Sequence, residues 1–174
     1  MHYLPSASRE VEQLAALGRV HDLLEGHGIE YWLFGGWAVD FYAGSITRPH
    51  DDIDIAVWLK DHGRISELLA ADGWKHAPEE DEDGGTGYER GAVRLELTFL
   101  VRGDDGRVYI PLREGRAPWS DEAFGRDVAE LRGVRVRLVG LGALKRGKSR
   151  FRDDPAEAAK DRADTATLSQ LDQV

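Results

Sequence analysis

The sequence predicts an α/β (α+β) protein with a small mixed β-sheet, helices around the sheet and a helical extension at the C-terminal end. Three observations support this prediction. Apolar residues recur at helical spacing in the N-terminal part, strand-like apolar and alternating segments dominate the middle, and helical patterns return from residue 140 onward. The 174 residues are enough for one domain with its own core. We expect a single domain over 1–174, with its core at about 20–138 and a helical part at about 139–174.

The first half of the chain is expected to alternate helices with short strands. Ser6 or Ser8 is suited to cap the first helix, and Asp61 is suited to cap a later one. The expected elements are a helix ending near Gly26 and Gly28, a strand at 29–34, a helix at 37–43, a strand at 53–59 and a helix at about 62–72.

The second half begins with an acidic, glycine-rich segment at 78–87, which indicates a loop or a hairpin tip. The clearest strand pattern lies at 92–101, where apolar and polar residues alternate. The remaining expected elements are a turn at 104–106, strands at 108–110 and 134–138, a helix from Gly140 that a basic loop interrupts, and a helix from Pro155 to about Leu171.

Composition narrows the class of protein. The absence of cysteine excludes disulfides, thiolate metal sites and a cysteine nucleophile. The net charge of −9 disfavours nucleic acid as a partner, because its phosphates would be repelled. The N-terminus lacks the features of a signal peptide, and no apolar run reaches the roughly 18 residues that a membrane span needs. We expect a cytoplasmic protein without membrane contact, either a monomer or a homodimer.

Two aspartates mark the strand at 53–59. Asp52 and Asp54 alternate with Ile53 and Ile55, so both carboxylates point to one face, with Cα atoms about 6.5–7 Å apart. Like charges at this spacing repel unless a cation or a proton lies between them. Oxygen ligands of this kind suit Mg²⁺, which commonly also binds substrate phosphates. The alternative is an exposed strand with solvated aspartates.

Two further features strengthen the interpretation as a metal and phosphate site. Glu96 lies mid-strand between two leucines, and it would join Asp52 and Asp54 if the strand at 92–101 pairs with the strand at 53–59. Three carboxylates in this arrangement are typical of two-metal phosphoryl transfer. The alternative for Glu96 is a cross-strand ion pair with an arginine. Gly35 and Gly36 stand between a strand and a helix, where the backbone can approach a phosphate closely.

The segment LFGGWAVDFYAGSITRPHDDIDIAV (33–57) carries a family resemblance. Its motif is Gly-Gly-Trp-Ala-x-Asp followed by Thr-Arg-x-His-x-Asp-x-Asp. The segment resembles the active-site region of the DNA polymerase β-like nucleotidyltransferase superfamily. It is most similar to the group of aminoglycoside 2″-adenylyltransferases and lincosamide nucleotidyltransferases. The likeness extends more loosely over about 20–171, including the Lys-Asp-Arg-Ala-Asp segment at 160–164.

The resemblance implies a nucleotidyltransferase fold and roles for particular residues. Asp52 and Asp54 would be catalytic and would bind two Mg²⁺ ions that hold the nucleoside triphosphate. Glu96 would be the third catalytic carboxylate, as metal ligand, as general base for the acceptor hydroxyl, or as both. Nucleotide binding would fall to Gly35, Gly36, Arg48 and His50. The motif residues Asp40 and Trp37 are assigned to structure, through a hydrogen bond between helix and loop and through core packing.

Four other residues are candidates with open alternatives. Lys148, within the basic segment 145–152, faces the phosphates or nucleic acid, or lies in a solvated loop balanced by Asp153, Asp154 and Glu157. Lys160 contacts the triphosphate or pairs with Asp164 one turn away. Trp119 borders the acceptor or packs in the core. Glu89 is a candidate for acceptor binding, and the acidic run 79–83 is either a solvated segment or a wall for a polycationic acceptor.

The sequence and the resemblance together predict an enzyme. It would use Mg²⁺ to transfer a nucleoside monophosphate from an NTP, with ATP as the expected donor, to a hydroxyl of a small molecule, releasing pyrophosphate. The expected acceptor is an antibiotic of the aminoglycoside or lincosamide type. The alternatives are a toxin-type nucleotidyltransferase that modifies tRNA or protein, and a non-catalytic NTP-binding or partner protein with the same fold.

Overall fold

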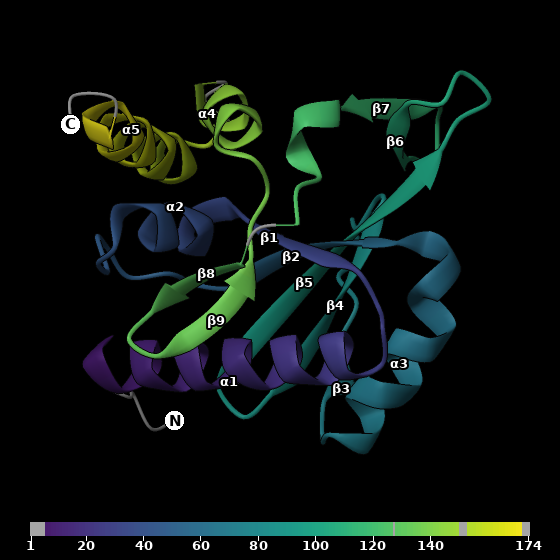
Figure 1. The fold of residues 1–174 in the computed structure, drawn as a ribbon, viewed down its shortest axis with the longest axis horizontal. Helices are drawn as coiled ribbons and strands as arrows, with labels where there is room; N and C mark the ends of the chain where they lie inside the picture. Colours follow the sequence, from purple (N-terminus) through teal and green to yellow (C-terminus); the bar gives the residue numbers. More distant parts are fainter. Residues whose placement is uncertain (1–5, 127, 150–152, 172–174) are drawn as a thin grey trace.

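The computed structural model of the protein describes residues 6–126, 128–149 and 153–171 (Figure 1). Helices and strands are mixed along the chain, as the sequence predicts. The helices are α1 (Ser6–Gly26), α2 (Gly35–Ala43), α3 (His62–Ala71), α4 (Leu141–Ser149) and α5 (Pro155–Gln170). The strands are β1 (Tyr31–Phe34), β2 (Ile53–Trp58), β3 (Lys75–His76), β4 (Gly85–Arg90), β5 (Val93–Arg102), β6 (Val108–Pro111), β7 (Arg116–Trp119), β8 (Val128–Leu131) and β9 (Val134–Arg137).

The main sheet is mixed, in the strand order β1-β2-β5-β4-β3. The central pair β2 and β5 runs parallel, whereas β1 against β2 and β4 against β5 run antiparallel. The far end of β5 continues through β6 to β7, and β8 and β9 form a separate hairpin. This arrangement confirms the predicted fold class of a mixed sheet with flanking helices.

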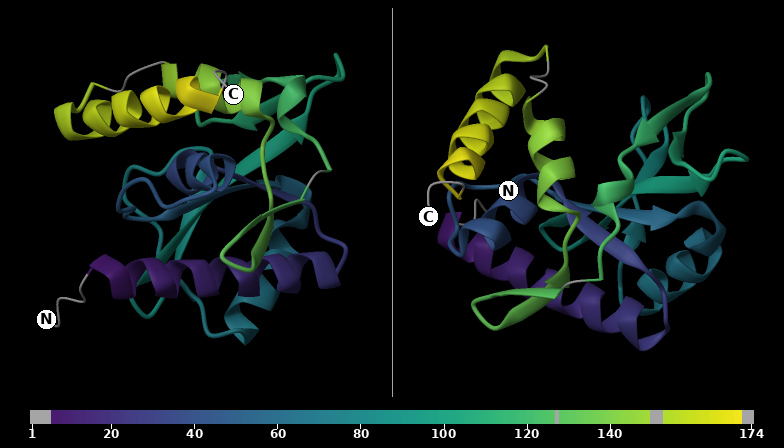
Figure 2. Two further views of the ribbon diagram at one scale, coloured as in Figure 1. Left: turned by 60° about the vertical axis from the view of Figure 1, so that its left-hand side comes forward. Right: turned by 45° about the horizontal axis from the view of Figure 1, so that its top comes forward.

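The helices cover the sheet from opposite sides, as the two turned views show (Figure 2). The long helix α1 lies along one side together with the β8–β9 hairpin. Helices α4 and α5 lie together on the other side, and α2 lies between them and α1. The backbone joins the C-terminal helices to the sheet, because the amide of Val139 donates to the carbonyl of Leu33 at 3.0 Å.

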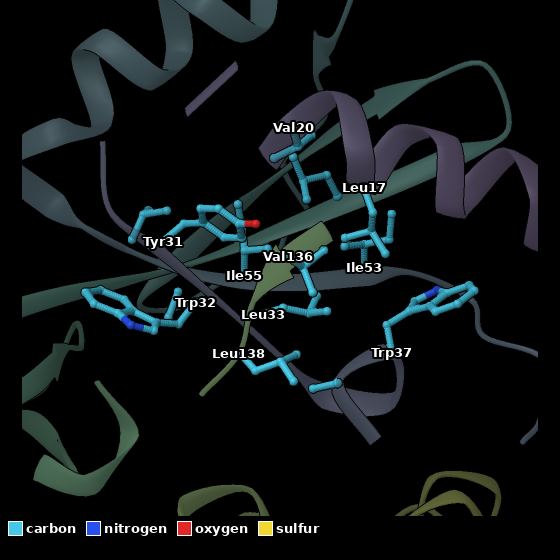
Figure 3. Close-up of a cluster of buried hydrophobic side chains, with 14 of the residues drawn as sticks. Leu17, Val20, Tyr31, Trp32, Leu33, Trp37, Ile53, Ile55, Val136 and Leu138 are labelled. Atoms are coloured by element: carbon cyan, nitrogen blue, oxygen red, sulfur yellow. The ribbon is translucent and has the colours of Figure 1, made fainter. Parts of the chain in front are cut away.

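The core gathers apolar side chains from α1, β1, α2, β2 and β9 around the centre of the sheet (Figure 3). The side chains labelled there include Leu17, Leu33, Trp37 and Ile55, each at most 1% exposed. The same buried cluster reaches Leu168 in α5. The C-terminal helices therefore share one core with the sheet.

Several predicted boundaries are wrong. Helix α2 begins at Gly35, so the two glycines form its first turn and do not precede it. The expected basic loop after Gly140 is helical through Ser149, which places Lys145 and Lys148 in α4, while Arg150 and Arg152 lie outside the described residues. Asp61 precedes α3 but makes no capping hydrogen bond, because it already belongs to a 3₁₀ turn, Leu59–Asp61.

The acidic segment 78–87 was expected to be a loop or a hairpin tip. It connects the antiparallel strands β3 and β4, as a hairpin tip does, but its last residues, 85–87, already belong to β4. Gly85 and Gly87 indicate a turn by composition, yet they are needed inside this strand. A Cβ at Gly85 would overlap the carbonyl of Leu97, and one at Gly87 would overlap the guanidinium of Arg94. The glycines therefore serve close packing against β5.

The final helix agrees with the sequence. It begins at Pro155, and the side chain of Asp154 accepts a hydrogen bond from the amide of Glu157. Among the described residues, no helix is both long and apolar enough to cross a membrane.

Candidate active site

The predicted carboxylates meet at the parallel pair β2 and β5. Asp54 and Glu96 are direct register partners across these strands. Asp52 lies two residues before Asp54, at the entrance of β2, so its side chain shares the same face. The structure thus contains the strand pairing on which the expected role of Glu96 depends, and it brings the three acidic residues to the same face of neighbouring strands.

Glycine backbone lies directly against this place. Gly35 has φ +73° and faces Asp54 so closely that a Cβ would overlap the Oδ2 atom. At Gly36, a Cβ would come within 2.5 Å of His50 Nδ1 and 2.7 Å of Arg48 Nη2. The first turn of α2 thus leaves room for the carboxylate and for two of the predicted nucleotide-binding side chains.

The carboxylates lie in an environment that disfavours their charge. Burial raises the pKa of Asp52 above its ordinary value, and the neighbouring charge of Asp51 raises it further. Burial also raises the pKa of Glu96, against the opposing hydrogen bond from Arg94. A site that raises the pKa of two neighbouring acids would gain free energy from a bound cation.

The three carboxylates are the kind of ligand that a divalent cation binds, but they are not arranged closely enough to surround one. In the described parts of the chain, no three acidic or histidine side chains lie close enough together to hold a metal ion. Glu96 instead pairs with Nε of Arg94. The sequence left a cross-strand ion pair with an arginine open as the alternative for Glu96, but the arginine found there, Arg94, lies on the same strand, two residues before it.

Asp40 organises the loop between α2 and β2. Its Oδ1 accepts hydrogen bonds from the amide and the hydroxyl of Thr47, at 3.1 Å and 2.5 Å, and its Oδ2 accepts from His50 Nε2 at 2.5 Å. Asp40, His50 and Trp37 are all buried. The structural roles predicted for Asp40 and Trp37 are confirmed. His50 packs on the Trp37 ring, with centroids 4.8 Å apart, inside the protein.

Arg48 and Lys148 converge on one buried acid of α5. Arg48 donates through Nε and Nη2 to the two oxygens of Asp164, each at 2.9 Å, and Lys148 Nζ lies 2.9 Å from Asp164 Oδ2. Lys148 also lies 3.7 Å from Asp161. Burial alone would raise the pKa of Asp164, but the two cations outweigh it and lower that pKa. The prediction that acids at 153, 154 and 157 balance Lys148 is therefore wrong, because Lys148 pairs with Asp164 and Asp161.

Lys160 has other partners than expected. Its ammonium donates to Asp51 at 2.6 Å and to Glu157 at 3.2 Å. The predicted alternative of an ion pair with Asp164 is wrong, because Arg48 and Lys148 occupy that carboxylate. Lys160 therefore reaches the residue beside Asp52 without touching Asp52 itself.

A cleft of about 710 Å³ opens between the sheet and α4. Its lining includes four of the predicted residues: Gly35, Asp54, Trp119 and Lys148. The half-buried Trp119 meets Phe34 edge-on at 5.2 Å between ring centroids and so forms an aromatic wall. Glu89 is outside the cleft lining and pairs with Arg94 at 3.0 Å.

The structure adds three arginines that the sequence interpretation did not single out as site residues in their own right. Arg107 and Arg146 line the cleft, and Arg94 contacts Glu96. Arg146 had been counted only within the basic segment, and it reaches Ser120 and Glu122 at 2.7 Å and 2.9 Å. The spacing of Arg94 from Glu96, two residues along one strand face, was the available signal for that contact.

These features define the class of the protein. Strand β1 leads through Gly35 and Gly36 into α2, and the next strand, β2, carries two aspartates and pairs with the strand that carries Glu96. The protein has a nucleotidyltransferase fold. The structure resembles the lincosamide antibiotic adenylyltransferase LnuA, solved with lincomycin bound, at TM-score 0.66 and 20% identity over 86% of this chain and 92% of that one. It also resembles ANT(2″)-Ia, an antibiotic-resistance factor solved in solution, at TM-score 0.68 and 19% identity over 92% and 89%.

The family follows from the sequence. The model of the aminoglycoside-2″-adenylyltransferase family matches residues 16–168, and the chain belongs to this family. A curated relative, the 2″-aminoglycoside nucleotidyltransferase of Escherichia coli, is 26% identical over 121 residues, which cover 70% of this chain and 56% of the relative. The chain thus spans little more than half the length of that relative.

Proposed function

We propose that the protein is a Mg²⁺-dependent nucleotidyltransferase. It transfers a nucleoside monophosphate from an NTP, with ATP as the expected donor, to a hydroxyl of an aminoglycoside or lincosamide antibiotic, and it releases pyrophosphate. The observation that carries the proposal is the register pair of Asp54 and Glu96, with Asp52 on the same face and the Gly35 backbone against Asp54. Membership of the aminoglycoside-2″-adenylyltransferase family supports the choice of reaction.

In this proposal Asp52, Asp54 and Glu96 hold the divalent cations. Two cations are expected, as in other sites of this chemistry. Such cations neutralise charge on the phosphates when they are bound. The acceptor hydroxyl oxygen forms a bond to the α-phosphorus while the bond from that phosphorus to the bridging oxygen breaks. Pyrophosphate leaves, and in this proposal Glu96 also takes the hydroxyl proton.

The cleft supplies the binding groups. Lys148, Arg107 and Arg146 line it as cations suited to the β- and γ-phosphates. Lys148 and Arg146 already pair with acids, and Asp54 and Asp161 share the lining, so Arg107 is the cation on which the proposal depends most. The aromatic wall of Trp119 and Phe34 offers a stacking surface for a base or for the acceptor. Glu89, close to the carboxylate site through Arg94, is a candidate to bind a cationic group of the acceptor.

The test is to incubate the protein with Mg²⁺, each of the four NTPs and a panel of aminoglycosides, lincosamides and simple sugars. Pyrophosphate release and the acceptor mass are measured together. We expect one acceptor to gain the mass of a nucleoside monophosphate. The variant Asp54→Asn should lose this activity by at least about 10³-fold, because it removes a metal ligand.

The matched control is Asp104→Asn, which removes the same charge from an exposed turn. It should keep full activity. Silence across the panel with Mg²⁺-dependent NTP binding intact would point to a macromolecular acceptor. Silence without any NTP binding would contradict the proposal.

A further inference from the structure

Arg94 lies at the centre of three glutamates. It precedes Glu96 by two residues on β5, and its Nε donates to that carboxylate. Its Nη1 donates to Glu89 Oε1 on β4 at 3.0 Å, and its Nη2 lies 3.4 Å from Glu79 Oε1. One guanidinium therefore joins the candidate catalytic strand to β4 and to the acidic segment before it.

The neighbouring strand is shaped around this side chain. Gly87 is the register partner of Glu96 on β4, and a Cβ there would overlap Nη2 of Arg94. The Arg94 side chain is only 18% exposed, whereas Glu79 and Glu89 are 60% and 55% exposed. The arginine is held in place beside Glu96, unlike a mobile surface side chain, and it leaves its two outer partners accessible to water.

Arg94 partly neutralises the negative charge of the site in the metal-free protein. Asp52, Asp54 and Glu96 share one face and repel one another. The positive charge of Arg94 acts against this repulsion at both Asp52 and Glu96. A carboxylate that binds an arginine through one oxygen and a metal through the other must divide its negative charge between two cations.

We propose that Arg94 is a positioning residue, a resident counter-cation that holds Glu96 in the metal-free protein and competes with the divalent metal for this carboxylate. When Glu96 turns to the metal, Arg94 keeps Glu89 and Glu79 as partners. The inference rests on the proposed function, since it takes Glu96 as a metal ligand.

The test measures Mn²⁺ affinity without turnover, by electron paramagnetic resonance of the free ion. Arg94→Gln should lower the Kd for Mn²⁺ by about three- to tenfold, because the competitor for Glu96 is gone. In the Glu96→Gln background the same change should move the Kd by less than about twofold. Arg90→Gln removes an equal charge from β4 without a contact to Glu96, and it should change the Kd by less than about twofold.

Glu89→Gln provides an opposite prediction at an exposed position on β4. Without Glu89, Arg94 should concentrate on Glu96 and raise the Kd for Mn²⁺ by about twofold or more. This variant decides the matter if Arg94→Gln proves unfolded in thermal melts. An unchanged or higher Kd in folded Arg94→Gln, or an effect that persists in Glu96→Gln, would overturn the inference alone. A wild-type protein that binds no Mn²⁺ would overturn the proposed function with it.

Discussion

Asp52 illustrates, at the scale of one residue, how a candidate active site costs stability. Its carboxylate is partly buried beside Asp51 and on the same face as Asp54, so ionising it in the folded, metal-free protein is unfavourable. The unfolded chain solvates the same charge freely. A group whose pKa is raised by folding subtracts from the free energy of unfolding wherever it is ionised.

Asp52→Asn is therefore expected to stabilise the metal-free protein at pH 7 while abolishing activity. The gain should be about 1 kcal/mol, or about 2–4 °C in Tm for a chain of this size. The gain should shrink as the pH falls through the raised pKa of Asp52 toward the ordinary value of 3.8, because the wild-type carboxyl then binds a proton and loses its charge. Thermal melts between pH 7 and pH 4 measure it.

Added Mg²⁺ provides the control for this prediction. It should stabilise the wild type and reduce the advantage of Asp52→Asn, because the variant lacks a ligand. A variant that is less stable than the wild type at pH 7 without metal would contradict the assignment of Asp52 as an unfavourable charge.

At the scale of elements, the sequence predicts best where one pattern is strong and local. The alternation at 92–101 and the apolar strand at 53–59 predict β5 and β2, which the structure pairs in parallel. Pro155 predicts the start of α5. In each case side-chain periodicity or a backbone constraint acts within a few residues.

The missed elements depend on partners far along the chain or on weak turn signals. Strand β7 contains Pro118 and pairs only with β6 in the main sheet, so its sequence resembles a loop. Strand β9 is predicted at 134–138, but β8 and the hairpin turn are missed. That turn passes through Arg132 and Gly133, both at positive φ, where Asn-Gly or Asp-Gly would be the recognisable pair. Similarly, nothing local to Lys148 shows that Asp164 will be its partner.

Asp164 links helix α5 to the loop before β2, and this link can be tested separately. Asp164→Ala leaves Arg48 and Lys148 without their shared buried carboxylate, and we expect a loss of about 3–4 kcal/mol in the free energy of unfolding. Urea denaturation at pH 7 measures the loss. Because the pKa of Asp164 is lowered in the folded state, this stabilisation is present above 3.8 and should fade as the pH falls through the lowered pKa.

The exposed Asp153, just before α5, offers the matched control. Asp153→Ala should stay within about 0.5 kcal/mol of the wild type. If Asp164→Ala were as stable as this control, the buried ion network would have no part in holding α5 against α4 and the loop before β2.

At the scale of the whole molecule, one buried cluster extends from α1 to α5, which supports our proposal that the chain forms a single domain. The net charge is −9, yet the cleft is lined by Arg107, Arg146 and Lys148. Under the proposed function, attraction of a triphosphate therefore comes from local cations acting against a repulsive surrounding field.

Arg107→Ala is expected to raise the Kd for the Mg²⁺ complex of the preferred NTP by about three- to tenfold at low salt. The difference should shrink as the ionic strength rises, because Arg107 is exposed. Calorimetric titration at two salt concentrations checks both points. Arg113→Ala removes an exposed charge outside the cleft lining and should bind as the wild type does; equal losses in the two variants would contradict a local role.

The parallel pairing of β2 with β5 also bears on how the protein folds. Parallel neighbours cannot be joined by a tight turn, so α3, β3 and β4 must all be laid down before Glu96 reaches Asp54. Contacts this distant in sequence form late and slowly. A nascent chain that has completed β1, α2 and β2 carries the whole glycine and aspartate motif but lacks Glu96, the third carboxylate of the candidate site. Under the proposed function, the onset of metal binding during refolding would time the pairing of β2 with β5.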